Sequence, residues 1–464
     1  MPSITARFGK NCFAFRCLRL LVVLAAAPLC GPSSPAYAAP LPEEKPIPLE
    51  AAKNYFAEAR MICERDHAQL WGISICGPIM LVDSSSRFLV TNQADANGTL
   101  TKEEGVFTGT LPKDQNIANT EIWWSGVHWT QMMWPLPEEV AACDTLIAHE
   151  LFHRIAGDLH IARATKTIMP DNGHLDTLDG RYYLQLEWRA LTRALETSND
   201  AERRKAIGDA LIFRAERYRL FPNGKVPEID LEMNEGLAEY TGVKLGNPVP
   251  SDQVKTAIAS LNRGPKAATF VRSFAYATGP AYGLLLDQYV PNWRQAIRDG
   301  NGFIPLLEGS LHVSAGSNLP QEATAREAGY RGVALKASEK ERDDNRRRMA
   351  AEYRKRFIEN PVLTMTFRHN NIAFNPSGLQ PLDNVGTVYS TARISDDWGV
   401  LEASKGVLIK QDWSAAMIPA PADTTGETIK GEGWTLTLKP GWKLVPAARK
   451  GDFTLAAPDQ SASH

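Results

Sequence analysis

The sequence predicts an α+β protein in three parts: a β-rich N-terminal part, a mostly helical middle and a small β-rich C-terminal part. Short β-type runs fill the chain from Ile73 to Trp134, and helical spacing of apolar residues dominates from Leu136 to about Val290. After Pro361, short apolar stretches alternate with Gly, Pro and Asp turns. With 44% hydrophobic and 22% charged residues, the chain has the composition of a soluble globular protein.

Residues 1–38 have the pattern of a secretory signal peptide. Basic residues precede the apolar run Leu20–Leu29, which is too short to span a bilayer. The small residues Ala36 and Ala38 flank Tyr37 and form a small-x-small cleavage site. We therefore expect cleavage after Ala38 and a periplasmic or secreted mature protein.

The charge of the mature chain argues against some partners. Cleavage removes four basic and no acidic residues from totals of 51 Lys+Arg and 53 Asp+Glu, which leaves a net charge of −6. An acidic balance of this kind does not favour nucleic-acid binding. No later segment reaches about 18 uninterrupted apolar residues, so we expect no membrane span in the mature chain.

Three cysteines follow the signal segment. Cys63 and Cys76 bracket a short segment, and an oxidising compartment favours a disulfide between them. Cys143 enters an apolar helix, which is typical of a buried thiol rather than a reactive one.

Residues 39–135 are expected to form an N-terminal helix followed by a sheet. Helical spacing of apolar residues extends over Leu49–Asp66. The runs "IMLVD", "RFLVTNQ", "GVFTGTL" and "VHWTQMMWPL" then read as strands. The four tryptophans between Glu121 and Trp134 fit a substrate cleft and sheet packing equally well.

Residues 136–335 are expected to be a helical core. Pro137 suits the first turn of a helix, and the acidic Glu138 and Glu139 favour the positive end of its dipole. Further helices are predicted over three ranges: Gly180–Glu196, Asp200–Phe221 and Leu231–Leu245. In a polar turn before them, His174 is predicted to be a cap or surface residue.

Residues 336–360 are predicted to form a charged helix, and residues 361–464 a small β-rich region. The helix could bind a polyanion, but acidic residues interleave its basic ones. That pattern favours a solvated helix with pairs four residues apart.

The segment "TLIAHELFHRIAG" contains the candidate metal ligands and the candidate general base of the chain. His149, Glu150 and His153 fit the pattern H-E-x-x-H inside an apolar helix. Residues four apart lie one turn apart on the same helix face, so both imidazoles could bind one Zn²⁺ ion per chain. Glu150 lies beside them as a general base for a zinc-activated water.

A catalytic zinc needs a third protein ligand, and three residues compete for that role. His160 approximates the third histidine of the metzincin pattern, but Gly157 and His160 each fall one residue late. Glu187 sits in an apolar helix, where an unpaired carboxylate is costly. Glu235 lies in "MNEGLAEYTG", on a helix that could pack antiparallel to the first.

The H-E-x-x-H segment followed by "NEGLAEY" resembles the gluzincin metallopeptidases, in particular the aminopeptidase N and glycyl aminopeptidase-like (peptidase MA-like) groups. The resemblance implies a zincin-like catalytic core in which Glu235 is the third zinc ligand. The segment "YATGPAYGLLL" is similar to the Y-x-x-G helix of these families, which implies that Tyr276 stabilises the oxyanion. The likeness covers about Pro135 to Tyr289.

The chain also departs from that pattern. Glu235 follows His153 by 82 residues, which requires inserted helices. The sequence contains no G-x-M-E-N segment, which in the aminopeptidases holds the N-terminus of the substrate. Endopeptidase and aminopeptidase activity therefore both remain possible. A gluzincin-like fold would run an edge strand beside the zinc, so Val127–Trp134 is expected to bind peptide by strand addition.

Zinc ligands usually need further residues that orient them. Glu187, Glu239 and Asp158 are the candidates to hold a ligand imidazole from behind.

We therefore expect an exported zinc metallopeptidase that hydrolyses a peptide or protein substrate, with Glu150 and Tyr276 as catalytic residues. Two other classes remain open. One is a zincin-like periplasmic scaffold that binds a partner without turnover, although such a scaffold would not need the base Glu150. The other is a zinc hydrolase that acts on a non-peptide amide.

Overall fold

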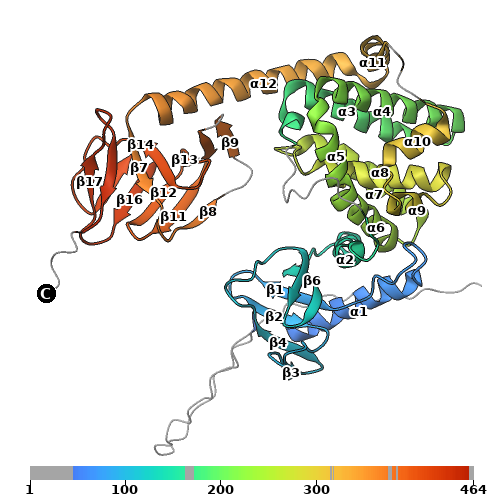
Figure 1. Ribbon diagram of the computed structural model, residues 1–464, viewed down its shortest axis with the longest axis horizontal. Coiled ribbons are helices and arrows are strands. Elements are labelled where there is room, and N and C mark those ends of the chain that lie inside the picture. The colour runs from blue at the N-terminus through green and yellow to red at the C-terminus, as the bar shows by residue number, and fades with distance from the viewer. Residues whose placement is uncertain are drawn as a thin grey trace, which may run out of the picture. The chain divides into compact units, whose positions relative to one another are not determined.

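The computed structural model describes residues 45–161, 172–313, 316, 318–374, 379–382 and 385–458. The predicted signal peptide and its cleavage point after Ala38 lie outside these residues. Helix makes up 49% of the structure and strand 21%, with a β region first, helices in the middle and β sheets at the end, which confirms the predicted α+β class (Figure 1). Among the described residues, no helix combines the length and the apolar character needed to cross a membrane.

The helices agree closely with the apolar patterns of the sequence, and two of them continue as π-helices. The segment Glu232–Gly236 is a π-helix that leads into α6, and Lys355–Glu359 is one that extends α12. The α-helices are α1 (Leu49–Asp66), α2 (Val140–Ala156), α3 (Leu178–Glu196), α4 (Asp200–Leu220), α5 (Lys225–Leu231), α6 (Leu237–Gly246), α7 (Pro250–Arg263), α8 (Phe274–Tyr289), α9 (Trp293–Arg298), α10 (Phe303–Leu311), α11 (Leu319–Glu327) and α12 (Gly332–Arg354).

The N-terminal sheet precedes the helical middle and has the strand order β3-β4-β2-β1-β6-β5. Only the β1–β6 pair is parallel, and the other neighbours are antiparallel. Its strands are β1 (Ile79–Asp83), β2 (Phe88–Thr91), β3 (Thr101–Glu103), β4 (Val106–Thr110), β5 (Thr120–Trp124) and β6 (Val127–Trp134).

This strand order corrects the expected edge strand. Val127–Trp134 is β6, which is hydrogen-bonded on both sides, to β1 and to β5. The edge strand at this end of the sheet is β5, which pairs with β6. Of the tryptophans in this hairpin, Trp129 is buried in the core of the sheet, whereas Trp123 is 73% exposed and stacks on His128.

The C-terminal part contains two sheets with the orders β17-β18-β7-β14-β13-β10-β9 and β15-β16-β12-β11-β8. A core cluster that runs from Leu363 to Leu438 takes side chains from both sheets. The strands are β7 (Val362–Thr366), β8 (Asn371–Phe374), β9 (Leu379–Leu382), β10 (Gly386–Tyr389), β11 (Ala392–Asp396), β12 (Gly399–Ala403), β13 (Val407–Lys410), β14 (Ala415–Pro419), β15 (Thr428–Gly431), β16 (Trp434–Leu438), β17 (Lys443–Pro446) and β18 (Phe453–Ala456).

A separate core cluster runs from Ile47 to Leu335 and joins α1, the N-terminal sheet and the helices of the middle part. Cys63 and Cys76 form a disulfide that ties the end of α1 to the segment before β1. Cys143 is buried, and burial raises the pKa of its thiol to about 11, which fits the expected inert thiol.

Acidic and basic residues pair along α12, as the interleaved pattern predicts. Lys340 lies 2.6 Å from Asp344, and Arg347 lies 2.7 Å from Asp343. Arg342 and Arg346 also pair with acidic residues of the same helix, which is the pattern expected of a solvated helix.

Helix α2 begins later than the proline pattern predicts. The carboxylate of Glu139 accepts hydrogen bonds from the backbone N–H groups of Ala141 and Ala142 and so acts as the N-cap. Pro137 therefore lies before the helix rather than in its first turn. An N-cap satisfies donors that the first turn leaves unpaired, which explains why the helix starts at Val140.

Helix α6 packs antiparallel to α2, as expected for the segment that carries Glu235. Gly246, at the end of α6, meets Thr145 near the start of α2, whereas Glu239 contacts His149 further along α2. A Cβ atom at Gly246 would lie 2.6 Å from the backbone nitrogen of Thr145. The glycine therefore permits the close backbone approach that brings Glu235 and Glu239 toward α2.

Candidate metal centre

Helix α2 presents His149 and His153 on one face, one turn apart. The side chain of His149 is 5% exposed and that of His153 is 12% exposed. Their Nε2 atoms lie 3.0 Å apart, so both imidazoles point to the same place. The apolar residues around them explain the burial, because α2 contributes Ile147, Leu151 and Phe152 to the core.

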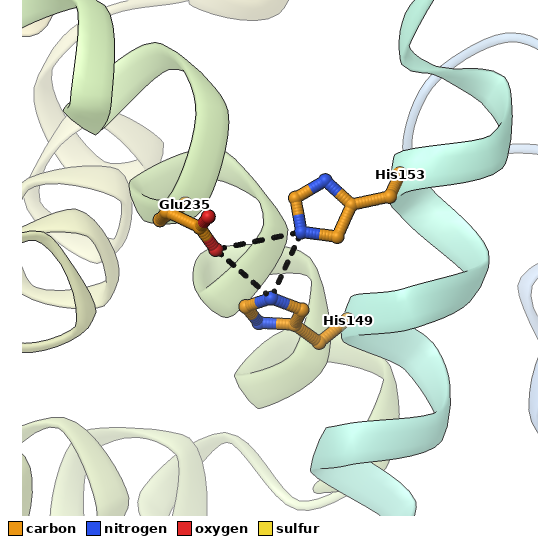
Figure 2. A group of neighbouring side chains, drawn as sticks. All are labelled: His149, His153 and Glu235. Atoms are coloured by element: carbon orange, nitrogen blue, oxygen red, sulfur yellow. Dashed lines mark hydrogen bonds and ion pairs between the residues drawn. The ribbon is translucent and has the colours of Figure 1, made fainter. Parts of the chain in front are cut away.

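Glu235 completes a group of three potential metal ligands. Its Oε2 atom lies 3.5 Å from the Nε2 atom of His149 and 3.5 Å from that of His153. One ligand atom from each residue lies within 4.8 Å of the others (Figure 2). We call these three residues the His–His–Glu group.

The π-helix Glu232–Gly236 carries Glu235 to this position. A π turn inserts an extra residue into a helix and is frequent at functional sites. Gly279 of α8 lies against this turn, and a Cβ atom there would lie 2.3 Å from the Cα atom of Gly236. Helix α8 can therefore approach closely and bring Tyr276 over Glu235.

Two side chains bind the Glu235 carboxylate from the α8 side. The hydroxyl of Tyr276 donates a hydrogen bond to Oε2 at 2.7 Å, and Nη2 of Arg272 donates to Oε1 at 3.2 Å. The Tyr276 ring also stacks on the imidazole of His149, with ring centroids 5.6 Å apart. Tyr276, which the sequence predicts as a catalytic residue, therefore lies in the site. Arg272 is a site residue that the sequence analysis missed.

Glu239 holds His149 from the opposite side of its ring. The Nδ1 atom of His149 lies 2.8 Å from Oε2 of Glu239. A proton on Nδ1 leaves Nε2 with its lone pair directed at the His–His–Glu group, which is the arrangement that metal-ligating histidines require. Of the residues expected to orient an imidazole, Glu239 is the one that contacts it.

The electrostatics of the group favour added positive charge. Burial lowers the pKa of His149, but hydrogen bonds to Glu235 and Glu239 outweigh it and raise the pKa to about 10. Burial opposes ionisation of Glu235, yet hydrogen bonds from His149 and His153 hold its pKa well below the usual range. The His149 shift reflects the carboxylates around its ring, which favour positive charge at this position.

Glu150 is the buried residue of the site without a complete set of partners. Its Oε2 atom accepts no hydrogen bond from a described residue. Burial raises the pKa of Glu150 more than His149 and His153 lower it. A raised pKa suits a group that takes and returns a proton near neutral pH.

The residues fit a divalent metal ion. Two imidazole nitrogens and a carboxylate oxygen are a known ligand set for catalytic zinc, which keeps a further position open. Such a site also needs a carboxylate that can act as a base and a residue that orients a ligand imidazole. Glu150, with its unpartnered oxygen, fits the first role, and Glu239, bonded to His149, fits the second. A cavity of about 920 Å³ adjoins the group and is lined by His149, Glu150, His153, Glu235 and Tyr276, among others.

Glu187 lies outside this group and has other partners. Its carboxylate is fully buried and accepts hydrogen bonds from Arg214 at 2.8 Å, Arg217 at 2.7 Å and Tyr282 at 2.6 Å. The structure therefore places Glu187 neither at the ligand positions nor behind a ligand imidazole. Arginines from α4 satisfy its charge instead of a metal.

His160 and Asp158 also lie outside the His–His–Glu group. Both are exposed and follow the end of α2 at Ala156. The geometric group contains neither of them.

His174 was predicted to be a cap or surface residue, and this prediction is wrong. Its Nε2 atom lies 2.7 Å from Oε1 of Glu228, which is fully buried, and the His174 side chain is 10% exposed. The polar turn around His174 misled the prediction, because Glu228 lies 54 residues later and no local pattern pairs the two.

Comparisons with known proteins identify no relative. Scans against protein-family models, curated proteins and solved structures all find no match. The gluzincin resemblance therefore rests on the motif residues and stays a prediction.

Proposed function

We propose that this chain is an exported zinc-dependent metallopeptidase that hydrolyses peptide bonds. The observation that carries the proposal is the convergence of His149, His153 and Glu235 from two distant segments onto one point beside a buried, incompletely bonded Glu150. A metal-free structural role for this set would leave like-charged carboxylates buried together, which is costly. The resemblance to gluzincins supports the same assignment.

Glu150 and Glu239 would have different roles in the hydrolysis. A bound zinc ion supplies Lewis-acid polarisation of a water molecule and of the substrate carbonyl. Glu150 accepts the proton of the attacking water and passes it to the leaving amine. Glu239 keeps the proton of His149 on Nδ1 and so orients the ring.

Tyr276 is the candidate to stabilise the oxyanion. Burial and the neighbouring Glu235 carboxylate raise the pKa of its hydroxyl above the usual range. The hydroxyl therefore stays protonated at neutral pH and remains a hydrogen-bond donor for developing negative charge.

The position of the cavity favours a peptide substrate. Residues that precede and begin the edge strand β5, including Asn119, Thr120 and Glu121, line the cavity together with the His–His–Glu group. Among the described strands, β5 is paired only with β6. An extended peptide could bind such an edge by strand addition and present its carbonyl to Glu150.

The test is peptide hydrolysis and metal content in the mature protein, residues 39–464. We expect one zinc per chain and cleavage of a quenched-fluorescent peptide library. Glu150→Gln should retain zinc and lower kcat/KM by about 10²- to 10⁴-fold. Glu138→Gln is the matched control, because Glu138 is exposed just before α2 and does not line the cavity.

Three outcomes would contradict the proposal. The first is a wild-type protein that takes up no zinc. The second is a zinc-loaded protein that cleaves ester or non-peptide amide substrates but no peptide. The third is a Glu150→Gln variant that cleaves peptides at the wild-type rate.

A further inference from the structure

The connection between α7 and α8 gathers positive charge beside the His–His–Glu group. Arg263 ends α7, Lys266 ends the short 3-10 helix that follows, and Arg272 lies just before α8. All three side chains are on exposed residues. We call them the basic connection.

The basic connection lines a second cavity of about 530 Å³. Glu239, Ser260 and Tyr276, as well as Arg263 and Arg272, line both this cavity and the larger one at the His–His–Glu group. A ligand bound at the larger cavity can therefore place a neighbouring group in the smaller one.

Two of the three cations of this cavity, Arg263 and Lys266, make no ion pair with a described acidic residue. Nη2 of Arg263 donates to the neutral Ser260 hydroxyl at 3.3 Å, and Lys266 makes no ion pair with a described residue. Arg272 contacts Glu235 through one bond of 3.2 Å. The single carboxylate in the lining is Glu239, which is already bonded to His149.

Three carboxylates of the larger cavity, those of Glu150, Glu235 and Glu239, belong to the candidate metal site, and the other two have contacts elsewhere. Glu121 of β5 lies 3.0 Å from Nε2 of His128, and Glu139 caps α2. The cleft is therefore charge-asymmetric, with available positive charge on the side of α7 and α8. The net charge of the chain is negative, so this positive cluster is a local exception. A cluster of positive charge attracts negatively charged ligands.

We propose that the basic connection is a subsite for a carboxylate of the substrate, located beside the scissile bond. Arg263 and Lys266 supply the available charge, and Arg272 links the subsite to Glu235. The carboxylate comes from an acidic side chain or from a free peptide C-terminus. This inference deepens the proposed peptidase function and rests on it for the catalytic part of the test.

The catalytic test uses pairs of quenched-fluorescent peptides. One series replaces Gln by Glu at each position in turn, and a second compares a free C-terminal acid with its amide. We expect one acidic placement to raise kcat/KM about tenfold, which corresponds to about 1.4 kcal/mol. The series that shows the gain identifies the source of the carboxylate.

Charge variants then locate the subsite. In Arg263→Gln/Lys266→Gln the acid-to-neutral ratio of kcat/KM should fall to about one. Lys255→Gln is the matched control, because Lys255 lies on α7, pairs with Asp252 and does not line either cavity. Its ratio should equal that of the wild type. A ratio that survives in the double variant would overturn the proposal.

Equilibrium binding separates this proposal from the proposed function. Fluorescence anisotropy of the same Glu and Gln peptides is measured on Glu150→Gln protein, with and without the two charge substitutions. Charge-dependent binding without any hydrolysis by the wild type would refute the peptidase function and support the subsite. Hydrolysis and binding that are both indifferent to the acid would refute the subsite and leave the peptidase function standing.

Discussion

Two clusters of buried charge lie in the helical part of the molecule, and they are neutralised in different ways. In the first, which we call the arginine network, Arg214 and Arg217 of α4 pair with Glu187, Glu228 and Glu232. All five side chains are 2% exposed or less. The chain itself supplies the cations, as buried carboxylates require.

Among the described residues, no buried arginine or lysine pairs with the His–His–Glu group. Glu150, Glu235 and Glu239 surround two imidazoles, and the arginine that contacts Glu235, Arg272, is 48% exposed. The arginine network is complete as it stands, whereas the His–His–Glu group is arranged to receive a cation. The comparison explains why Glu187 and Glu235, which look alike in sequence, have different environments.

The two clusters are joined through shared elements. Arg214 binds Glu232 through both of its terminal nitrogens, and Glu232 begins the π-helix that carries Glu235. Tyr282 of α8 donates to Glu187, six residues after Tyr276 on the same helix. The arginine network therefore helps to hold the π-helix that carries Glu235 and the helix α8 that carries Tyr276.

The largest expected effect comes from breaking the arginine network. Arg217→Met removes one cation and leaves Glu228 and Glu187 without it, so we expect a loss of about 3–5 kcal/mol in unfolding free energy. Urea unfolding measures this. Arg204→Met is the matched control, because Arg204 and its partner Asp200 are 48% and 60% exposed, and the substitution should cost less than about 1 kcal/mol. Equal losses in the two variants would remove the distinction between the clusters.

Zinc should stabilise the protein through the other cluster. At free zinc about 100-fold above Kd, we expect a gain of about 2.7 kcal/mol in wild-type unfolding free energy after prior chelation. Glu235→Ala should lose most of that gain, and His160→Ala should keep it, since His160 is exposed beyond α2. Chemical unfolding with and without zinc is the measurement. Undiminished stabilisation of Glu235→Ala would show that Glu235 is not a ligand.

Substitution of Glu239, which contacts Nδ1 of His149, should have a smaller effect on zinc binding than substitution of Glu235. Glu239→Gln weakens the bond that fixes the Nδ1 proton, so we expect zinc affinity to fall about 10- to 100-fold. Competition with a chromophoric chelator measures the affinity, with Glu138→Gln as control. An unchanged affinity would mean that the ring is held in place by packing alone, for instance by its stack on Tyr276.

The fold class and the α2 motif could be predicted because their signals are local. Apolar periodicity gave the range Leu49–Asp66 for a helix that the structure has with the same bounds. The spacing of His149 and His153 on one helix fixes their common face, whatever surrounds them. Such features need no knowledge of distant contacts.

The rest depended on contacts between distant residues. The choice between Glu187 and Glu235 turned on Arg214 and Arg217, which lie 27 and 30 residues after Glu187. A signal was present, because two arginines three apart interrupt the apolar stretch "ALIFRAERYRLF". Buried arginines call for buried acids, and this rule would have assigned Glu187 to them. The prediction that Val127–Trp134 is an edge strand was wrong for a similar reason, because the order of strands in a sheet depends on contacts between distant segments.

The smallest expected effect is an acid dependence confined to the arginine network. Burial raises the pKa of Glu228, but Arg217 and His174 outweigh it and lower the pKa to about 2, below the ordinary 4.5. A lowered pKa adds stability that is fully present above pH 4.5 and is lost as the pH falls toward 2. The stability advantage of wild type over Glu228→Gln should therefore shrink by about 1 kcal/mol between pH 7 and pH 4.

Urea unfolding of both proteins at the two pH values, each with excess chelator, measures this difference. Chelation should not alter it, because arginine rather than metal holds Glu228. An advantage that grows as the pH falls would mean that burial dominates and that Glu228 is held protonated. In that case the arginine network would not be self-neutralising, and the contrast with the His–His–Glu group would have to rest on the zinc measurements alone.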